Sequence, residues 1–187
     1  MTRRPSSPHP GMETYRGQTY RGQWGGFRSG MPPYRDRAPG GAGRQVPVAA
    51  LQGALAAEHA AVWVYGVAGA FMSSTLARRL DEAATAHQAR RDATERMLID
   101  AGVPPVPPEP GYLTPEPVTD AASALRLVIT AETDAAAAWR SVVERSPADP
   151  DVRGAALEAL TAAAVRATRW RQTAGSVPLT VPFPGTP

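Results

Sequence analysis

The chain has 187 residues and no cysteine, which excludes disulfides and zinc sites built on thiolates. Its formal net charge is +3 at neutral pH, and every basic side chain is an arginine. The length is sufficient for one domain with its own hydrophobic core. No stretch contains the roughly 20 consecutive apolar residues that a membrane-spanning helix needs, so we expect a cytoplasmic protein without membrane contact.

Residues 1–45 differ from the rest of the chain in composition and charge. They contain eight arginines and two acids, whereas residues 46–187 contain twelve arginines and fifteen acids. Glycine, proline, arginine and tyrosine dominate and aliphatic residues are few, which predicts a disordered tail. The sequence TYRGQ occurs twice in succession, and arginine with tyrosine can bind single-stranded nucleic acid by charge and stacking. The alternatives are a variable extension without such a role and a translation start after this stretch.

Residues 46–187 show apolar residues at helical spacing. Residues that commonly cap helices stand before three of the periodic stretches, and Pro150 suits the first position of a helix. The pattern predicts four helices: residues 46–71; from a cap at Ser73 or Ser74 to residue 101; from a cap at Thr119 or Asp120 to residue 145; and from a cap at Asp149 to residue 172.

Proline-rich residues 102–118 separate the second and third predicted helices. Proline excludes a helix interior here, and about 17 extended residues can reach ~56 Å. Each predicted helix is roughly 36–42 Å long, so this connection can cross the whole bundle. Two tight hairpins joined by a long crossover predict an all-α, ferritin-like four-helix bundle over residues 46–187. We expect its extended end to place three apolar residues along the helices: Leu179, Val181 and Phe183.

Each predicted helix carries a stripe of residues spaced three or four positions apart, which predicts its core face. The first three stripes are Leu51, Leu55, Glu58, Val62, Tyr65 and Gly69; Leu76, Leu80, Ala83, His87, Arg90, Thr94 and Met97; and Leu125, Val128, Glu132, Ala135, Trp139 and Val142. The fourth is Leu160, Ala163, Ala167 and Trp170, with Arg166 and Arg169 at its edge.

Polar residues lie near the middle of every stripe, although core positions are usually apolar. Mid-helix positions meet at the same depth of a bundle, so we expect these residues to converge: Glu58, His87, Arg90, Glu132 and Arg166 or Arg169. Arginine pairs well with carboxylates, and the expected result is a buried Arg–Glu–His network. The alternatives are Glu58 turned to solvent, His87 as an ordinary core histidine, and a solvated face at residues 90–92.

The aromatic residues of the stripes, together with Trp63, predict core or interface packing rather than a cofactor site: Tyr65, Trp139 and Trp170. His59 faces away from the stripe of its helix, and we expect it to be exposed.

Residues 49–185 resemble the ferritin-like superfamily, and specifically an uncharacterised actinobacterial ferritin-like family. The resemblance rests on five segments: EHAAVWVYGVAG, HQARRD, AETDAAAAWR, AAVRATRWR and VPFPG. The superfamily's di-iron site takes one glutamate from the first and third helices and a Glu-x-x-His pair from the second and fourth. Glu58 and Glu132 match the single glutamates. The pairs do not match, because this chain has His87-x-x-Arg90 and Arg166-x-x-Arg169 in their places.

Arginine cannot ligate a metal, so the mismatch argues against a di-iron oxidase. The sequence therefore favours a non-catalytic ferritin-like bundle that serves in binding or assembly, with no cofactor. Its partner would be an unknown protein or a second copy, because alanine-rich helix faces permit close approach. The alternative is a metal-binding protein or oxidase with a degenerate iron or manganese site at Glu58, His87 and Glu132.

Motifs of several common enzyme classes are absent from the sequence. It has no glycine-rich phosphate loop before a helix, no G-x-S-x-G elbow and no H-E-x-x-H metal motif. Ordinary hydrolysis is therefore not expected.

Overall fold

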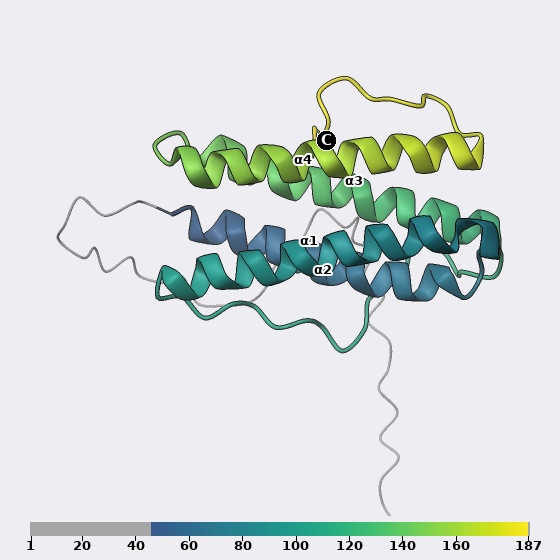
Figure 1. The fold of residues 1–187 in the computed structure, drawn as a ribbon, viewed down its shortest axis with the longest axis horizontal. Helices are drawn as coiled ribbons and strands as arrows, with labels where there is room; N and C mark the ends of the chain where they lie inside the picture. Colours follow the sequence, from purple (N-terminus) through teal and green to yellow (C-terminus); the bar gives the residue numbers. More distant parts are fainter. Residues whose placement is uncertain (1–45, 187) are drawn as a thin grey trace, which may run out of the picture.

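The computed structural model describes residues 46–186, which form four long helices (Figure 1). These are α1 (Val48–Gly69), α2 (Ala77–Asp100), α3 (Ala121–Arg145) and α4 (Pro150–Ala174), with the short 3-10 helix η1 (Ser74–Leu76) before α2. The predicted all-α, four-helix fold class is confirmed. The expected tail and its nucleic-acid contact fall on residues 1–45, outside the described residues.

Two of the predicted caps fix where helices begin. The Asp120 side chain accepts a hydrogen bond from the Ser123 backbone N–H, and the Ser123 hydroxyl closes a capping box with the Asp120 backbone. The Asp149 side chain accepts from two backbone N–H groups at the start of α4, with Pro150 in the first turn. The predicted cap at Ser73 or Ser74 is confirmed in position only: Ser73 stands at the N-cap of η1, which leads into α2, but its hydroxyl contacts Thr75 and makes no capping hydrogen bond.

Proline-rich residues 102–118 connect α2 to α3 in the sequence and run back along the outside of the bundle, as Figure 1 shows. This crossover joins the hairpin of α1 and α2 to the hairpin of α3 and α4. The helices pack as a chain of neighbours, α2 on α1, α1 on α3 and α3 on α4. α2 and α4 are not close backbone neighbours, and they meet through side chains such as Arg79, which donates a hydrogen bond to Thr173. No helix among residues 46–186 is long and apolar enough to cross a membrane.

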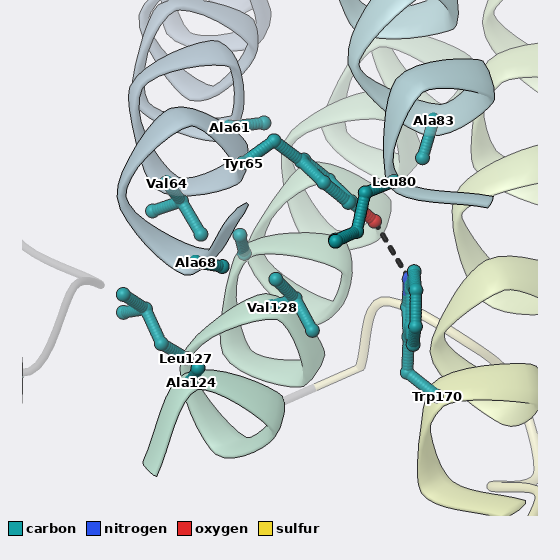
Figure 2. Close-up of a cluster of buried hydrophobic side chains, with 11 residues drawn as sticks. Ala61, Val64, Tyr65, Ala68, Leu80, Ala83, Ala124, Leu127, Val128 and Trp170 are labelled. Carbon is teal, nitrogen blue, oxygen red and sulfur yellow. Dashed lines mark hydrogen bonds between the residues drawn. The ribbon is translucent and has the colours of Figure 1, made fainter. Parts of the chain in front are cut away.

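The apolar core falls into two main clusters along the bundle. Figure 2 shows one of them, in which Tyr65, Val128 and Trp170 come from α1, α3 and α4. The other contains Leu55, Trp139 and neighbouring side chains of all four helices. Fully buried polar residues of α1, α2 and α3 lie between these clusters along the sequence of each helix: Glu58, His87 and Glu132.

The buried face of α1 differs from the predicted stripe in the second half of the helix. Val62 is partly exposed and Gly69 is exposed, whereas Ala61, Val64 and Ala68 are buried. The predicted steps average 3.5 residues, but an α-helix has 3.6 residues per turn, so the buried face drifts by about 20° per heptad.

The structure corrects the expectation for His59 and, in part, the expectation for the C-terminal segment. His59 was expected to be exposed, yet only 6% of its surface is accessible, and its Nε2 lies 3.2 Å from the Val106 carbonyl oxygen of the crossover. The C-terminal segment contacts α3 through its backbone, where the Phe183 carbonyl accepts a hydrogen bond from Arg140. Of the side chains expected along the bundle, Phe183 is largely exposed at 77%, whereas Leu179 and Val181 are 43% and 39% exposed.

Candidate functional site

A polar network crosses the middle of the bundle, with His87 of α2 at its centre. The His87 Nδ1 lies 2.6 Å from Oε2 of Glu58 on α1, and the His87 Nε2 lies 3.2 Å from Oε1 of Glu132 on α3. All three side chains are fully buried. The imidazole therefore bridges two carboxylates that neighbouring helices supply.

The two carboxylates favour the charged form of His87. Burial acts to lower the pKa of His87, but the hydrogen bonds and charges of Glu132 and Glu58 outweigh it and raise this pKa above its usual 6.5. Burial acts to raise the pKa of Glu132, but His87 and Arg166 hold it below its usual value. The arrangement is that of an imidazolium that donates one N–H to each carboxylate.

Arg166 of α4 completes the pairing of Glu132. Its Nε donates to the Glu132 Oε1 over 2.6 Å, and its side chain is only 15% exposed. The Arg166 Nη2 also lies 3.4 Å from the His87 Nε2, so two positive groups approach the same carboxylate. A charge-assisted pair of this length is among the stronger hydrogen bonds in proteins.

The two other predicted arginines are placed differently. Arg90 of α2 is 19% exposed, and its Nη1 lies 4.0 Å from the Glu58 Oε1, beyond hydrogen-bond distance. Arg169 is exposed on α4. Of the pair that the sequence left open, Arg166 therefore joins the network, and Arg169 lies outside it.

Three aromatic donors belong to the network, although the sequence pattern indicated only packing for them. The Tyr65 hydroxyl donates to the Glu132 Oε1 over 2.5 Å, and Trp139 Nε1 donates to the Glu58 Oε1 over 2.6 Å. Trp170 Nε1 donates in turn to the Tyr65 hydroxyl, as the dashed line in Figure 2 marks. Burial, followed by the charge of Glu132, raises the pKa of Tyr65, which keeps the hydroxyl protonated as a donor.

The sequence did contain a signal for these donors. Tyr65 and Trp139 each stand seven residues after a buried glutamate on the same stripe. A buried tyrosine or tryptophan usually needs a partner for its polar atom, and each of these two bonds to the glutamate of the other helix, so the spacing indicated the depth of the network and not the pairing.

The geometry does not fit a metal centre of the ferritin type. His87 offers its two nitrogens to carboxylates on opposite sides of its ring, so Glu58, His87 and Glu132 do not converge on one point. Arg166 occupies the contact with Glu132 that a helix-4 ligand would make. Among residues 46–186, no group of three or more histidine, aspartate or glutamate side chains is arranged to hold a metal ion.

Comparison with known proteins identifies the family. Residues 50–187 match the family described as a domain of unknown function, DUF4439. The chain belongs to the DUF4439 family. Its fold is similar to the crystal structure of a conserved hypothetical protein, Rv2844, from Mycobacterium tuberculosis, with 41% sequence identity and a TM-score of 0.65. The match covers 67% of this chain and 94% of that chain. No curated protein matches significantly.

A cleft opens on the side of this DUF4439 domain where α2 and α4 separate. Its volume is about 260 Å³, and Arg79 and Ala83 of α2 face Val165, Arg166 and Trp170 of α4 across it. Because Arg166 belongs both to the cleft and to the buried network, this opening leads from solvent toward Glu132.

A second hollow of the DUF4439 domain, of about 380 Å³, lies between α1, α2 and the crossover. Trp63 and Tyr112 line it with their ring centroids 5.6 Å apart, and His59, Arg91 and Glu95 add mixed charge. The buried network does not reach this hollow.

Proposed function

We propose that this DUF4439 domain is a ferritin-like bundle that has exchanged a di-iron centre for a buried Arg–Glu–His network and acts as a non-catalytic binding module. The observation that supports this most directly is the contact between the Arg166 Nε and the Glu132 Oε1 at 2.6 Å. Arginine is always charged in proteins and has no lone pair to offer a metal. A guanidinium in the place of a ligand therefore supplies the positive charge that a metal would otherwise supply.

The charges of the network support the same proposal. Two buried carboxylates, Glu58 and Glu132, are matched by the His87 imidazolium and the Arg166 guanidinium. Buried ion pairs rarely add net stability, because desolvation costs about as much as the pairing returns. Their best-attested use is to fix register between helices, which suits a scaffold that holds a binding surface in shape. Pairing of two copies through alanine-rich faces and a cytoplasmic location are parts of this proposal.

One observation favours the alternative, a degenerate iron or manganese site at Glu58, His87 and Glu132. The Glu132 Oε2 is buried and has no hydrogen-bond partner among residues 46–186, so one carboxylate oxygen is available to a ligand. A metal at this atom would have to displace Arg166 or share its carboxylate.

Metal loading separates the two functions. The full chain is incubated anaerobically with Fe(II) and, separately, with Mn(II), then desalted and analysed for metal per chain. We expect close to none in the wild type and in the Glu58→Ala variant. About one metal per chain in the wild type, lost in Glu58→Ala, would establish the metal site and refute the network as a substitute for it.

A further inference from the structure

The walls of the α2–α4 cleft carry an excess of positive charge. Arg79, Arg166 and Arg169 line the cleft, against the single acid Glu82. Glu82 is already paired, since its Oε1 accepts from Arg78 over 2.7 Å on the exposed face of α2. Little negative charge in the cleft wall is left to balance the arginines.

Two of these arginines, Arg79 and Arg169, form no ion pair with an acidic side chain among residues 46–186. Arg79 lies over the Trp170 ring at 5.1 Å and donates to the Thr173 hydroxyl, so it has no acidic partner among residues 46–186. The Arg169 side chain makes no hydrogen bond or ion pair within residues 46–186. Arg166 is neutralised by Glu132 at the cleft floor, which leaves the two outer guanidinium groups uncompensated.

Arg90, further along α2, does not line the cleft. Its Nη1 is buried without a hydrogen-bond partner among residues 46–186 and lies 4.0 Å from the Glu58 Oε1, so the carboxylate beside it belongs to the buried network.

Building on the proposed binding function, we propose that the α2–α4 cleft binds a small organic anion, whose carboxylate or phosphate head is held by Arg79 and Arg169. Guanidinium groups bind both heads with two oxygens at once, so the cleft chemistry is shared between the two classes. Ala83, Val165 and Trp170 supply an apolar wall for the rest of the molecule. The cleft volume of about 260 Å³ restricts the ligand to a small molecule.

Calorimetric titration of the full chain tests the inference. The protein is first treated with a chelator and then titrated with phenyl phosphate and, in a second arm, with benzoate, with the ionic strength held constant. We expect saturable binding of one anion per chain in at least one arm. The Arg169→Gln variant should weaken it by about tenfold or more, as for the loss of one charge-assisted hydrogen bond. Arg79→Gln should weaken it as well, with both variants verified as folded by circular dichroism.

Arg96→Gln is the matched control, because Arg96 is an exposed arginine of α2 that does not line the cleft. It should leave the affinity unchanged. No saturable binding of either anion, or equal losses in Arg96→Gln and Arg169→Gln, would overturn the anion site. The arm that binds identifies the head group, phosphate or carboxylate.

Failure of the anion site and failure of the proposed function give different results. Metal-loaded wild-type protein that still binds the anion would refute the metal-free network and leave the cleft assignment standing. Protein that takes up neither metal nor anion would refute the cleft assignment and leave the network standing.

Discussion

Glu132 is the residue on which most of the network depends. Its Oε1 receives hydrogen bonds from Tyr65, His87 and Arg166, each from a different helix. These three hydrogen bonds to one oxygen atom connect α1, α2 and α4 to α3 at the same level along the bundle. The register of the four helices is therefore tied to one carboxylate, which lies between the two apolar clusters.

Asp134, one further acid of α3, has no such partners. Its Oδ2 is buried without a hydrogen-bond partner among residues 46–186, and burial raises the pKa of Asp134 to about 6, from a usual 3.8. The folded state thus holds this proton more tightly than the unfolded state does. Between these two pKa values stability falls as pH rises, and above pH 6 the full cost of the buried charge is present.

Asp134→Ala should therefore stabilise the protein in a pH-dependent way. After allowance for partial solvent screening, we expect the gain in unfolding free energy at about pH 8 to exceed the gain at about pH 4 by about 1–2 kcal/mol. Urea unfolding at the two pH values measures this difference. Glu144→Ala, at an exposed position of the same helix, should show little pH dependence. Equal gains for Asp134→Ala at both pH values would show that the carboxyl group is not destabilised by burial.

At the scale of elements, the start of α3 depends on the capping box of Asp120 and Ser123. The proline-rich crossover cannot continue into a helix, so α3 needs a defined first turn where it leaves that segment. An aspartate at this end both caps backbone N–H groups and complements the helix dipole.

Asp120→Ala should lower the unfolding free energy, because the change removes the side-chain acceptor of the capping box. Asp100→Ala is the matched comparison, because Asp100 is exposed at the C-terminal end of α2, where an acid opposes the dipole. That change should be neutral or slightly stabilising. Thermal and urea unfolding measure the stability of both variants. Equal losses of stability in Asp120→Ala and Asp100→Ala would contradict the capping role.

The sequence was sufficient to predict most of these elements. Spacing, proline positions and the caps at Asp120 and Asp149 locate the helices closely. The cap before α2 was correct in position but not in its hydrogen bond, because spacing does not fix whether the Ser73 hydroxyl bonds to the backbone or to the Thr75 side chain. The prediction for His59 was wrong, since a helical wheel does not reveal that the crossover covers this face.

At the scale of the whole molecule, the convergence of Glu58, His87 and Glu132 followed from their common depth in the helices. The choice of Arg166 over Arg169 could not be predicted, because two residues three positions apart lie on nearly the same face of a helix. The opening between α2 and α4 could not be predicted from the sequence either. Apolar periodicity predicts which face of a helix is buried, but not how far the helix lies from its neighbours. That opening is where the proposed anion site lies.

The central claim is that a guanidinium and an imidazolium stand where a metal would otherwise lie. Anomalous diffraction from crystals of the full chain soaked anaerobically in Fe(II), with data at the iron edge, tests it most directly. We expect no anomalous peak near Glu58, His87 or Glu132, with Arg166 still hydrogen-bonded to Glu132. A peak bound by these carboxylates, with Arg166 turned away from Glu132, would contradict it.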